Sequence, residues 1–111
     1  DWLLGPAAFE ALSPALLRVL KMLVEKCGEA GVTLSLCGEM ASKPLDAMAL
    51  LGVGMRHLSM SAPAFFEVKS MLRSLHVGDL AAYMDQLYHL PVRTLRPYLK
   101  AYAADHGVRL G

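Results

Sequence analysis

Strict alternation runs through Val32-Thr33-Leu34-Ser35-Leu36-Cys37, where large aliphatic residues take turns with small, mostly polar ones. Because successive side chains of a strand point to opposite faces, this period of two predicts a β-strand over residues 32–37. One face of that strand is apolar and suited to packing under helices, and the other is small and polar. Cys37 ends the polar face, and Gly38 behind it would let a ligand approach the backbone closely.

A second alternating stretch covers residues 56–60, where Leu58 and Met60 oppose His57 and Ser59. It predicts a second strand with the same two kinds of face. Helix-like spacing, proline starts and glycine stops predict helices around both strands. These helices are expected to start near Pro14, Pro44, Ser61, Asp79 and Thr94 and to end near Gly28 and Gly31, Leu51, Leu75, Leu90 and His106, with residues 38–43 forming a loop.

The order of these elements indicates an α/β fold. Strands of about six residues that alternate with helices are typical of parallel βαβ units. Two strands cannot complete a parallel sheet, because such sheets are covered on both faces and contain several strands. We therefore expect the end of a larger architecture such as a (β/α)8 barrel, in which the carboxyl ends of the strands carry the chemistry.

The composition excludes several classes of protein. The chain has 111 residues, of which 55% are hydrophobic and 19% charged, so it is not intrinsically disordered. Its net charge of +1 gives no electrostatic reason to expect nucleic acid or an anionic membrane as a partner. Charged residues interrupt every apolar segment before the 18 or so residues of a spanning helix, and the start Asp1–Leu4 lacks the basic region of a signal peptide.

Cysteines and histidines do not form a recognisable metal motif. Without a secretion signal, the reducing cytoplasm is the expected location, and Cys27 and Cys37 are expected to be free thiols. The four histidines lie far apart and have no metal-ligand spacing, so no metal site is predicted.

Three motifs at their observed spacing resemble the phosphoenolpyruvate-utilising enzymes, and within them the phosphoenolpyruvate–protein phosphotransferases of the phosphotransferase system. These are Leu36-Cys37-Gly38-Glu39-Met40-Ala41, Leu50-Leu51-Gly52-Val53-Gly54 and Leu58-Ser59-Met60-Ser61, and the resemblance covers residues 12–75. It implies that residues 1–75 form the C-terminal end of a phosphoenolpyruvate-binding TIM barrel, its last two β/α units. Residues 76–111 would then be a C-terminal helical extension.

The resemblance also implies an activity and its partners. Enzymes of this kind bind phosphoenolpyruvate and Mg²⁺ at the barrel mouth and pass the phosphoryl group to a histidine on a mobile domain. From there it moves to a phosphocarrier protein. The residues that hold Mg²⁺ and the phosphate precede the segment seen here, and we expect the parent enzyme to be a cytoplasmic homodimer.

Cys37 heads the Cys-Gly-Glu motif, whose cysteine the resemblance identifies as the catalytic acid that converts enolpyruvate to pyruvate. A thiol suits this step, because its ordinary pKa of about 8.5 keeps it protonated at neutral pH. Gly38 and Glu39 are expected at the substrate, and an ionised Glu39 would oppose thiolate formation. From the residues alone, Cys37 would be an inert buried thiol and Glu39 equally a solvent-facing loop residue.

Other residues have structural interpretations. His57 is expected to be structural, Ser59 and Ser61 to cap a helix or line the barrel, and Met55, Met60 and Met71 to fill the core. Tyrosines of the extension form either a packing stripe or a docking surface, two alternatives that stay open: Tyr83, Tyr88, Tyr98 and Tyr102.

Two functions follow as hypotheses. In the first, the chain is the C-terminal segment of the phosphotransferase and is inactive alone, because it lacks the phosphate and metal sites on which phosphoryl transfer depends. In the second, it is a non-catalytic helical interaction or regulatory module that retains a barrel remnant. Parallel neighbouring strands with an accessible Cys37 favour the first, and a Cys37 sealed in an all-helical core favours the second.

Overall fold

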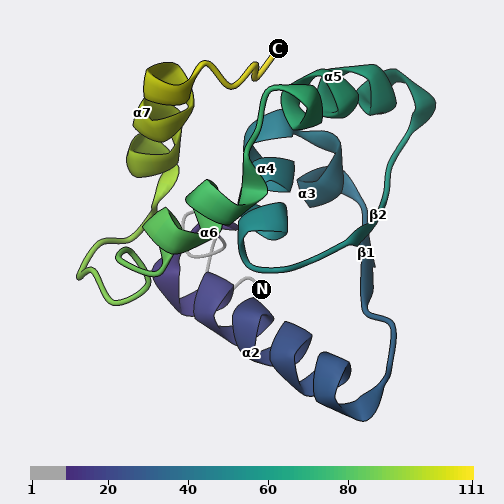
Figure 1. Ribbon diagram of the computed structural model, residues 1–111, viewed down its shortest axis with the longest axis vertical. Coiled ribbons are helices and arrows are strands. Elements are labelled where there is room, and N and C mark those ends of the chain that lie inside the picture. The colour runs from purple at the N-terminus through teal and green to yellow at the C-terminus, as the bar shows by residue number, and fades with distance from the viewer. Residues whose placement is uncertain (1–9) are drawn as a thin grey trace, which may run out of the picture.

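A computed structural model describes residues 10–111, and the expectation for Asp1–Leu4 lies outside these residues. Seven of the eight elements were expected from the sequence, although their ends differ. The elements, in chain order, are α2 (Pro14–Ala30), β1 (Ser35–Cys37), α3 (Glu39–Ser42), α4 (Pro44–Gly52), β2 (His57–Ser59), α5 (Ala62–Arg73), α6 (Val77–Met84) and α7 (Arg96–His106) (Figure 1).

Helix α2 begins as its sequence predicts. Ser13 is the N-cap, and its Oγ accepts a hydrogen bond from the Leu16 N–H at 3.1 Å, while Pro14 occupies the first turn. Gly28 and Gly31 are the residues expected to end this helix, and the helix runs past Gly28. It stops at Gly31, whose φ of 71° ends the helix in the left-handed conformation that glycine tolerates best.

The two strands form a parallel sheet, as the alternation of strands and helices predicts. Ser35 pairs with His57, Leu36 with Leu58, and Cys37 with Ser59. Both strands are shorter than the predicted ranges, residues 32–37 and 56–60. The backbone conformation explains where the pairing begins and where it ends. Residues 32–34 lie opposite 54–56, where the chain turns at a φ of 112° on Gly54, and beyond Cys37 the φ of 107° on Gly38 ends the extended backbone.

The predicted faces are confirmed for the residues that form the strands, whereas Val32, predicted on the apolar face, lies before β1 and is 57% exposed. Leu36 and Leu58 are half-buried and pack against the hydrophobic core. Their neighbours in the strands, namely Ser35, Cys37, His57 and Ser59, are exposed on the other face.

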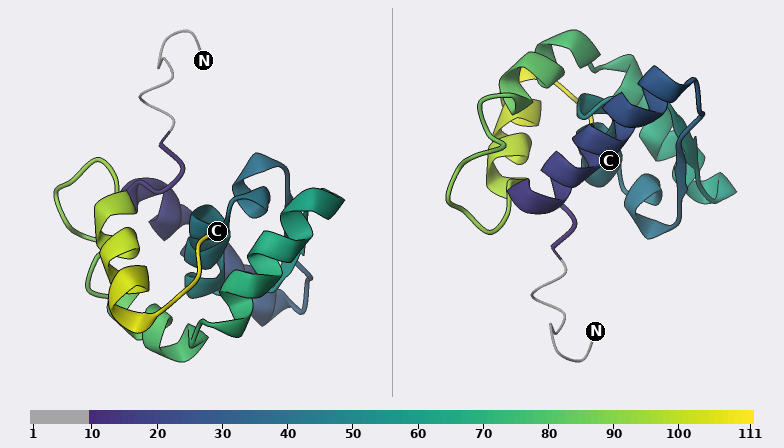
Figure 2. Two further views of the ribbon diagram at one scale, coloured as in Figure 1. Left: turned by 90° about the horizontal axis from the view of Figure 1, so that it is seen from above. Right: turned by 90° about the horizontal axis from the view of Figure 1, so that it is seen from below.

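Helix α4 is the centre of the core. Every residue from Leu45 to Gly52 is buried, and α5, α6 and α7 all contact this helix (Figure 2). The fit against α6 is close, because a Cβ built on Gly52 would lie 2.2 Å from the sulfur of Met84. The extension thus covers a helix that would otherwise expose apolar side chains to water.

An ion-paired cluster joins segments that lie far apart in the sequence. Arg96, at the start of α7, donates from Nη1 to Asp46 of α4 and from Nε to Glu10, both at 2.9 Å. Burial raises the pKa of Glu10, but the Leu12 N–H and the Arg96 guanidinium more than offset this, so the pKa is lowered overall. The Leu95 N–H also donates to the Leu12 carbonyl at 2.8 Å.

The prediction of a loop at residues 38–43 is wrong, because the short helix α3 forms there. Gly38 is its N-cap, and the Ser42 Oγ donates to the Gly38 carbonyl at 3.1 Å, a bond that stabilises a single turn. Buried Ala41 holds this turn against the core.

Four helix boundaries in the second half also differ from expectation. Helix α5 stops at Arg73 instead of Leu75, and α7 begins at Arg96, because the Thr94 Oγ1 accepts from the Arg96 N–H. Helix α6 begins at Val77, because His76 Nδ1 accepts from the Asp79 N–H as an N-cap, and it ends at Met84 instead of Leu90.

The fold is therefore a small, mostly helical α/β arrangement around two parallel strands. Within residues 10–111, no helix has both the length and the apolar character needed to cross a bilayer. Cys27 and Cys37 are free thiols, as expected.

Candidate functional site

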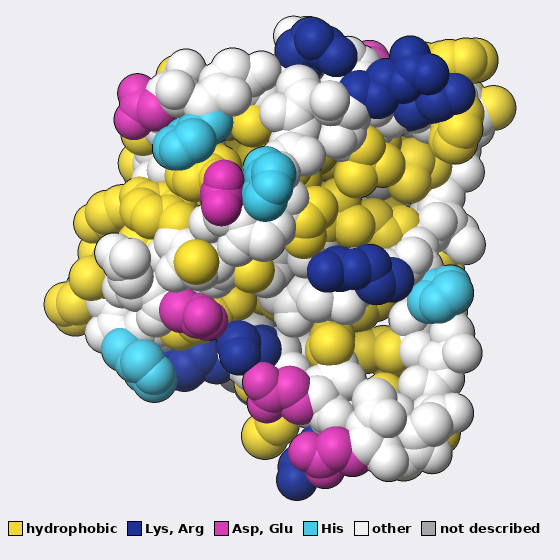
Figure 3. Space-filling model, in the orientation of Figure 1, with side chains coloured by type: hydrophobic (Ala, Val, Ile, Leu, Met, Phe, Trp, Pro, Cys, Tyr) yellow, Lys and Arg dark blue, Asp and Glu magenta, His cyan; other side chains and the backbone are white. Residues whose placement is uncertain are grey.

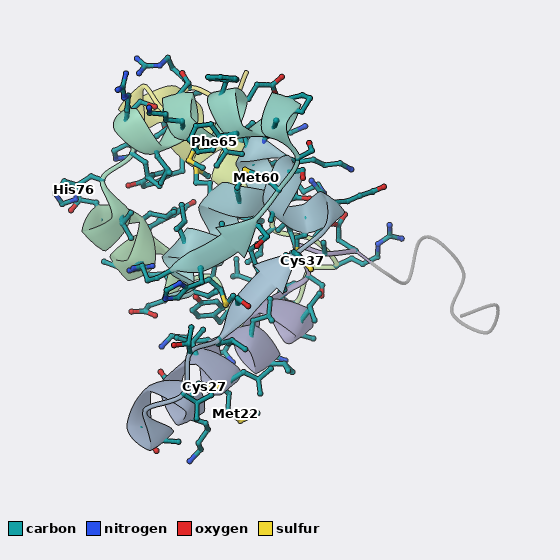
Figure 4. The ribbon with its side chains drawn as sticks, turned by 90° about the vertical axis from the view of Figure 1, so that its right-hand side faces the viewer. Met22, Cys27, Cys37, Met60, Phe65 and His76 are labelled. Atoms are coloured by element: carbon teal, nitrogen blue, oxygen red, sulfur yellow. The ribbon has the colours of Figure 1, made fainter. Side chains whose placement is uncertain are left out.

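The carboxyl ends of both strands lie side by side. Cys37 is the last residue of β1 and Ser59 the last of β2, and the two are partners in the parallel register. Figure 4 shows Cys37 where β1 ends, with Met60 beyond the end of β2. This is the position at which α/β barrels carry their functional side chains.

A shallow hollow of about 430 Å³ opens at these strand ends. All three residues predicted for the site lie on it, together with side chains that follow β2. The lining consists of Cys37, Gly38, Glu39, Ser42, Ser59, Met60 and Ser61. Residues separated by more than twenty positions in the sequence are thus assembled by the parallel pairing of the strands.

Cys37 is exposed on the polar face of the sheet. Its position follows from the period of two in β1, because Leu36 faces the core and the next side chain must face away from it. The thiol is therefore not sealed inside an all-helical core, and a small molecule in the hollow can reach it.

Gly38 leaves room next to that thiol. Its φ of 107° and ψ of −161° belong to a region that side chains rarely adopt, so the turn requires glycine. Apart from its two chain neighbours, no residue has a heavy atom within 4 Å of the position that a Cβ would occupy. A ligand can therefore approach the backbone here, as the sequence predicts.

Glu39 and Ser42 form the α3 side of the hollow. Glu39 is the first residue of α3 and is exposed, which fits either a wall of the site or a contact with solvent. Ser42 was not predicted as a site residue. Its four-residue spacing from Gly38, a distance of one helical turn, is the signal that would have placed it beside the Cys-Gly-Glu motif.

Two serines come from the β2 side. Ser61 is the N-cap of α5, as expected, but its hydroxyl makes no capping hydrogen bond. Ser59 is exposed beside Cys37. Both hydroxyls lie on the hollow, so they are available to a bound molecule.

Other predicted residues lie away from the hollow. His57 is exposed at the start of β2, and Met55 and Met71 are buried in the core as expected. Tyr83 stacks on buried Tyr102 with ring centroids 5.2 Å apart. These two tyrosines pack between α6 and α7, and this supports the packing stripe over the docking surface for them.

No metal-binding group is formed by the described part of the chain. Across residues 10–111, histidine, cysteine, aspartate and glutamate side chains do not gather in threes or more in a way that could hold an ion. The hollow itself contributes a single carboxylate, that of Glu39.

Comparison with known proteins gives these strand ends a context. The family model described as "PEP-utilising enzyme, PEP-binding domain" matches residues 5–77. The chain is 41% identical over 71 residues to a "Phosphoenolpyruvate-dependent phosphotransferase system" protein of Salmonella typhimurium, a match covering 64% of this chain and 10% of that protein.

Two relatives named "Phosphoenolpyruvate-protein phosphotransferase" also match. The protein of Cupriavidus necator is 34% identical over 79 residues, which are 71% of this chain and 14% of that protein. The protein of Mycoplasma genitalium is 33% identical over 82 residues, which are 74% of this chain and 14% of that protein. The chain thus spans only about a tenth to a seventh of the length of the curated relatives it matches. By the match over residues 5–77, the chain belongs to the family of PEP-utilising enzymes and corresponds to part of their PEP-binding domain.

Proposed function

We propose that this chain supplies the C-terminal part of the substrate barrel of a phosphoenolpyruvate–protein phosphotransferase, with Cys37 as the acid that completes pyruvate formation. The observation that carries the proposal is the exposed Cys37 thiol at the carboxyl end of a parallel strand, on a hollow wide enough for a small substrate. An inert structural cysteine would be expected in the core instead.

The proposed step is a single proton transfer. When the phosphoryl group of phosphoenolpyruvate leaves for a histidine, the P–O bond breaks and the enolate of pyruvate remains. The Cys37 S–H bond then breaks as a C–H bond forms at carbon 3, which yields pyruvate and a thiolate. Water returns a proton to the thiolate before the next turnover.

The surroundings of Cys37 suit this role. The Glu39 side chain lines the same hollow as Cys37. Helix α5 begins directly after Ser61, and the partial positive charge at its N-terminal end favours an anionic substrate. Gly38 leaves the backbone open to such a molecule.

Other parts of the enzyme would come from outside this chain. Such an enzyme needs Mg²⁺ to neutralise the charge of the phosphate. The side chains of residues 10–111 do not form a site for this ion, and we propose that residues outside the chain hold it. The rest of a (β/α)8 barrel, the phosphohistidine domain and the contact with a phosphocarrier protein belong to the same proposal. So do a cytoplasmic location and a homodimeric parent enzyme.

A test can use a relative that carries the missing parts. Residues 10–111 would replace the matching C-terminal segment of the Cupriavidus necator protein, and Cys37→Ala would be compared with Cys27→Ala in this hybrid. Removal of a general acid is expected to slow pyruvate formation about 10²- to 10⁴-fold. Cys27 lies on α2, away from the hollow, so its variant should match the parent hybrid.

The stereochemistry of carbon 3 separates acid catalysis from a structural role. With phosphoenolpyruvate that carries deuterium and tritium stereospecifically at carbon 3, in ordinary water, the parent hybrid should form pyruvate with a chiral methyl group of one handedness, because one group delivers the proton to one face. In Cys37→Ala the residual pyruvate should be racemic at the methyl group. Retained handedness at the parent rate would exclude Cys37 as the acid.

A second function, a non-catalytic interaction module, is favoured by the apolar side chains that α2 and α5 expose. The two proposals differ in the hybrid, since a module would not restore pyruvate formation. The isolated 111-residue chain is expected to show no phosphoenolpyruvate-dependent phosphorylation of a carrier protein, and detection of that activity would contradict the assignment of the phosphate and metal sites to other segments.

A further inference from the structure

A cavity of about 350 Å³ lies between α6 and α7. This volume is at the small end of the range of pockets that bind ligands, roughly 300–1,000 Å³. Every residue that lines the cavity comes after residue 77, where the family match ends. The cavity is therefore separate from the hollow at Cys37 and from the matched part of the chain.

The cavity lies on the far side of α4 from the sheet. Figures 1 and 2 show α6 and α7 on one side of α4 and the two strands on the other. The helices of a (β/α)8 barrel surround its strands, and α6 and α7 contact α4 from outside this layer. The strands that complete such a barrel would pair with the edges of β1 and β2, away from the cavity.

Three aromatic rings form a stack along the cavity. The ring centroids of Tyr83 on α6 and Tyr102 on α7 are 5.2 Å apart, and those of Tyr102 and His106 are 3.9 Å apart. The interplanar angles are 20° and 16°, so the three rings are nearly parallel. A planar cation can lie on the outer face of such a stack, because the face of an aromatic ring carries partial negative charge.

The polar groups at the cavity are mainly hydrogen-bond acceptors. His106 Nδ1 lies 2.9 Å from the Tyr102 carbonyl, which can only accept, so the neutral ring carries its proton on Nδ1 and accepts at Nε2. Asp105, next to His106, and Asp79 of α6 add two carboxylates. Because His76 Nδ1 accepts from the Asp79 N–H, it has no proton there, and its contact of 3.4 Å with the Asp79 carboxylate is not an ion pair.

The Tyr102 hydroxyl is the most enclosed of these groups. Tyr102 is 6% exposed and lines the cavity, and its hydroxyl makes no hydrogen bond with another described residue. Burial raises the pKa of this hydroxyl, and the nearby charge of Asp79 raises it further, so the phenol keeps its proton. Buried polar groups are normally hydrogen-bonded, so an almost enclosed hydroxyl without a partner points to a ligand in the cavity.

No lysine or arginine side chain among residues 10–111 lines this cavity. On α7, Arg96 is paired with two carboxylates elsewhere, and helical spacing places Lys100 on the face opposite to the lining residues 101, 102, 105 and 106. Arg93 before α7 and Arg109 after it do not line the cavity either. Figure 3 shows acidic and histidine side chains over α6 and α7, with lysine and arginine side chains elsewhere on this face. The cavity thus carries two negative charges and, while His106 is neutral, no positive one.

We propose that the cavity between α6 and α7 binds a guanidinium group on a short aliphatic chain. A guanidinium is planar, so it can extend the ring stack, and its five N–H groups can donate to the two carboxylates, His106 Nε2 and the Tyr102 oxygen. An ammonium group has three donors and no planar face, so it matches these acceptors less well. The guanidinium can come from a free small guanidine or from an arginine side chain of a protein, and the test distinguishes these two sources.

Three ligands that differ only in the head group test the chemistry. Butylguanidinium carries the proposed group, butylurea is its neutral planar counterpart, and butylammonium has a compact charge. Isothermal titration calorimetry on the 111-residue chain gives the affinities, and NMR shows which backbone amides shift. We expect butylguanidinium to bind at one site, with shifts confined to α6 and α7. Butylurea should bind at least about tenfold more weakly, because its hydrogen bonds to the carboxylates are not charge-assisted on the donor side.

Conservative variants test the residues. Asp79→Asn and Asp105→Asn should each weaken the binding of butylguanidinium about threefold, since both carboxylates are exposed and water screens their charge. Tyr102→Phe removes only the hydroxyl and should weaken it about fivefold. Asp85→Asn is the matched control, because Asp85 directly follows α6, is exposed and does not line this cavity. Circular dichroism checks that each variant folds.

Several outcomes would overturn the proposal. They are the absence of saturable binding, butylurea or butylammonium binding as tightly as butylguanidinium, and an equal loss of affinity in Asp85→Asn. An acetylated tripeptide with a central arginine identifies the source: if it binds as well as butylguanidinium, the source is a protein side chain, and if only butylguanidinium binds, the source is a free small guanidine. Cys37→Ala should leave the affinity unchanged, which separates this proposal from that for the thiol.

Discussion

Arg96→Ala tests how strongly the ion-paired cluster holds the C-terminal extension to α4. In the folded chain the guanidinium lies 2.9 Å from Asp46 and 2.9 Å from Glu10. The Asp46 side chain is only 4% exposed, so the substitution leaves a buried carboxylate without its counter-charge. The loss should appear in the free energy of unfolding of the whole chain, because α4 is the centre of the core.

The structure gives the size of the effect. Removing one partner of a buried ion pair costs about 3–5 kcal/mol. The Arg96 side chain is 32% exposed, so water can partly hydrate the position that it leaves, and the lower end of the range applies. We therefore expect a loss of about 3 kcal/mol. At roughly 4 °C per kcal/mol for a domain of about this size, the melting temperature falls by about 12 °C.

Urea unfolding followed by circular dichroism measures this loss. Arg93→Ala is the matched comparison, because Arg93 is exposed and makes no ion pair with any residue from 10 to 111. The double variant Arg96→Ala with Asp46→Ala should lose less stability than the two single changes added together, since it leaves no buried charge. A loss below about 0.5 kcal/mol for Arg96→Ala, the range of ordinary surface changes, would refute the reasoning.

Three further predictions concern the site and the cluster. In the native chain, iodoacetamide should modify exposed Cys37 faster than half-buried Cys27, and mass spectrometry of the modified peptides showing equal rates would contradict the described geometry. Gly38→Ala should destabilise the chain by about 1–3 kcal/mol in urea unfolding through its backbone conformation alone, because its φ is 107° and the space beside it is empty. The pKa of Glu10 is lowered in the folded chain, so its stabilisation is fully present above its ordinary value of 4.5 and is lost as the pH falls through the folded pKa. Stability measured from pH 6 to pH 3 should therefore decrease less steeply in Glu10→Gln than in the parent chain.

Local patterns were sufficient to predict the two parallel strands and the position of Cys37 at the carboxyl end of the first. The alternation at residues 32–37 places the Cys37 side chain on the face of the strand opposite to that of Leu36. Parallel pairing then brings Cys37 beside Ser59, as the structure shows. The strand lengths could not be predicted in this way. They depend on the register, which sets residues 32–34 against the turn at Gly54.

Long-range contacts explain most of what the sequence did not reveal. Nothing local indicates that Glu10 and Arg96, which lie 86 positions apart, meet at a buried Asp46. The cap of α6 shows the same difficulty on a smaller scale. Aspartate is a common N-cap residue, which favours Asp79 from the sequence. The N-cap of α6 is His76 instead, because its ring nitrogen accepts a hydrogen bond from the Asp79 N–H.

The burial of α4 has a consequence for how the boundaries of this family are understood. The family match ends at residue 77, yet Leu80, Met84 and Leu99, which complete the wrapping of α4, come after it. A polypeptide trimmed to the matched segment would therefore expose apolar side chains of its central helix to water and would be prone to aggregation. The family match and the packing around α4 therefore end at different places in this chain, and substitutions at Leu80, Met84 or Leu99 are constrained by a helix that precedes them in the sequence.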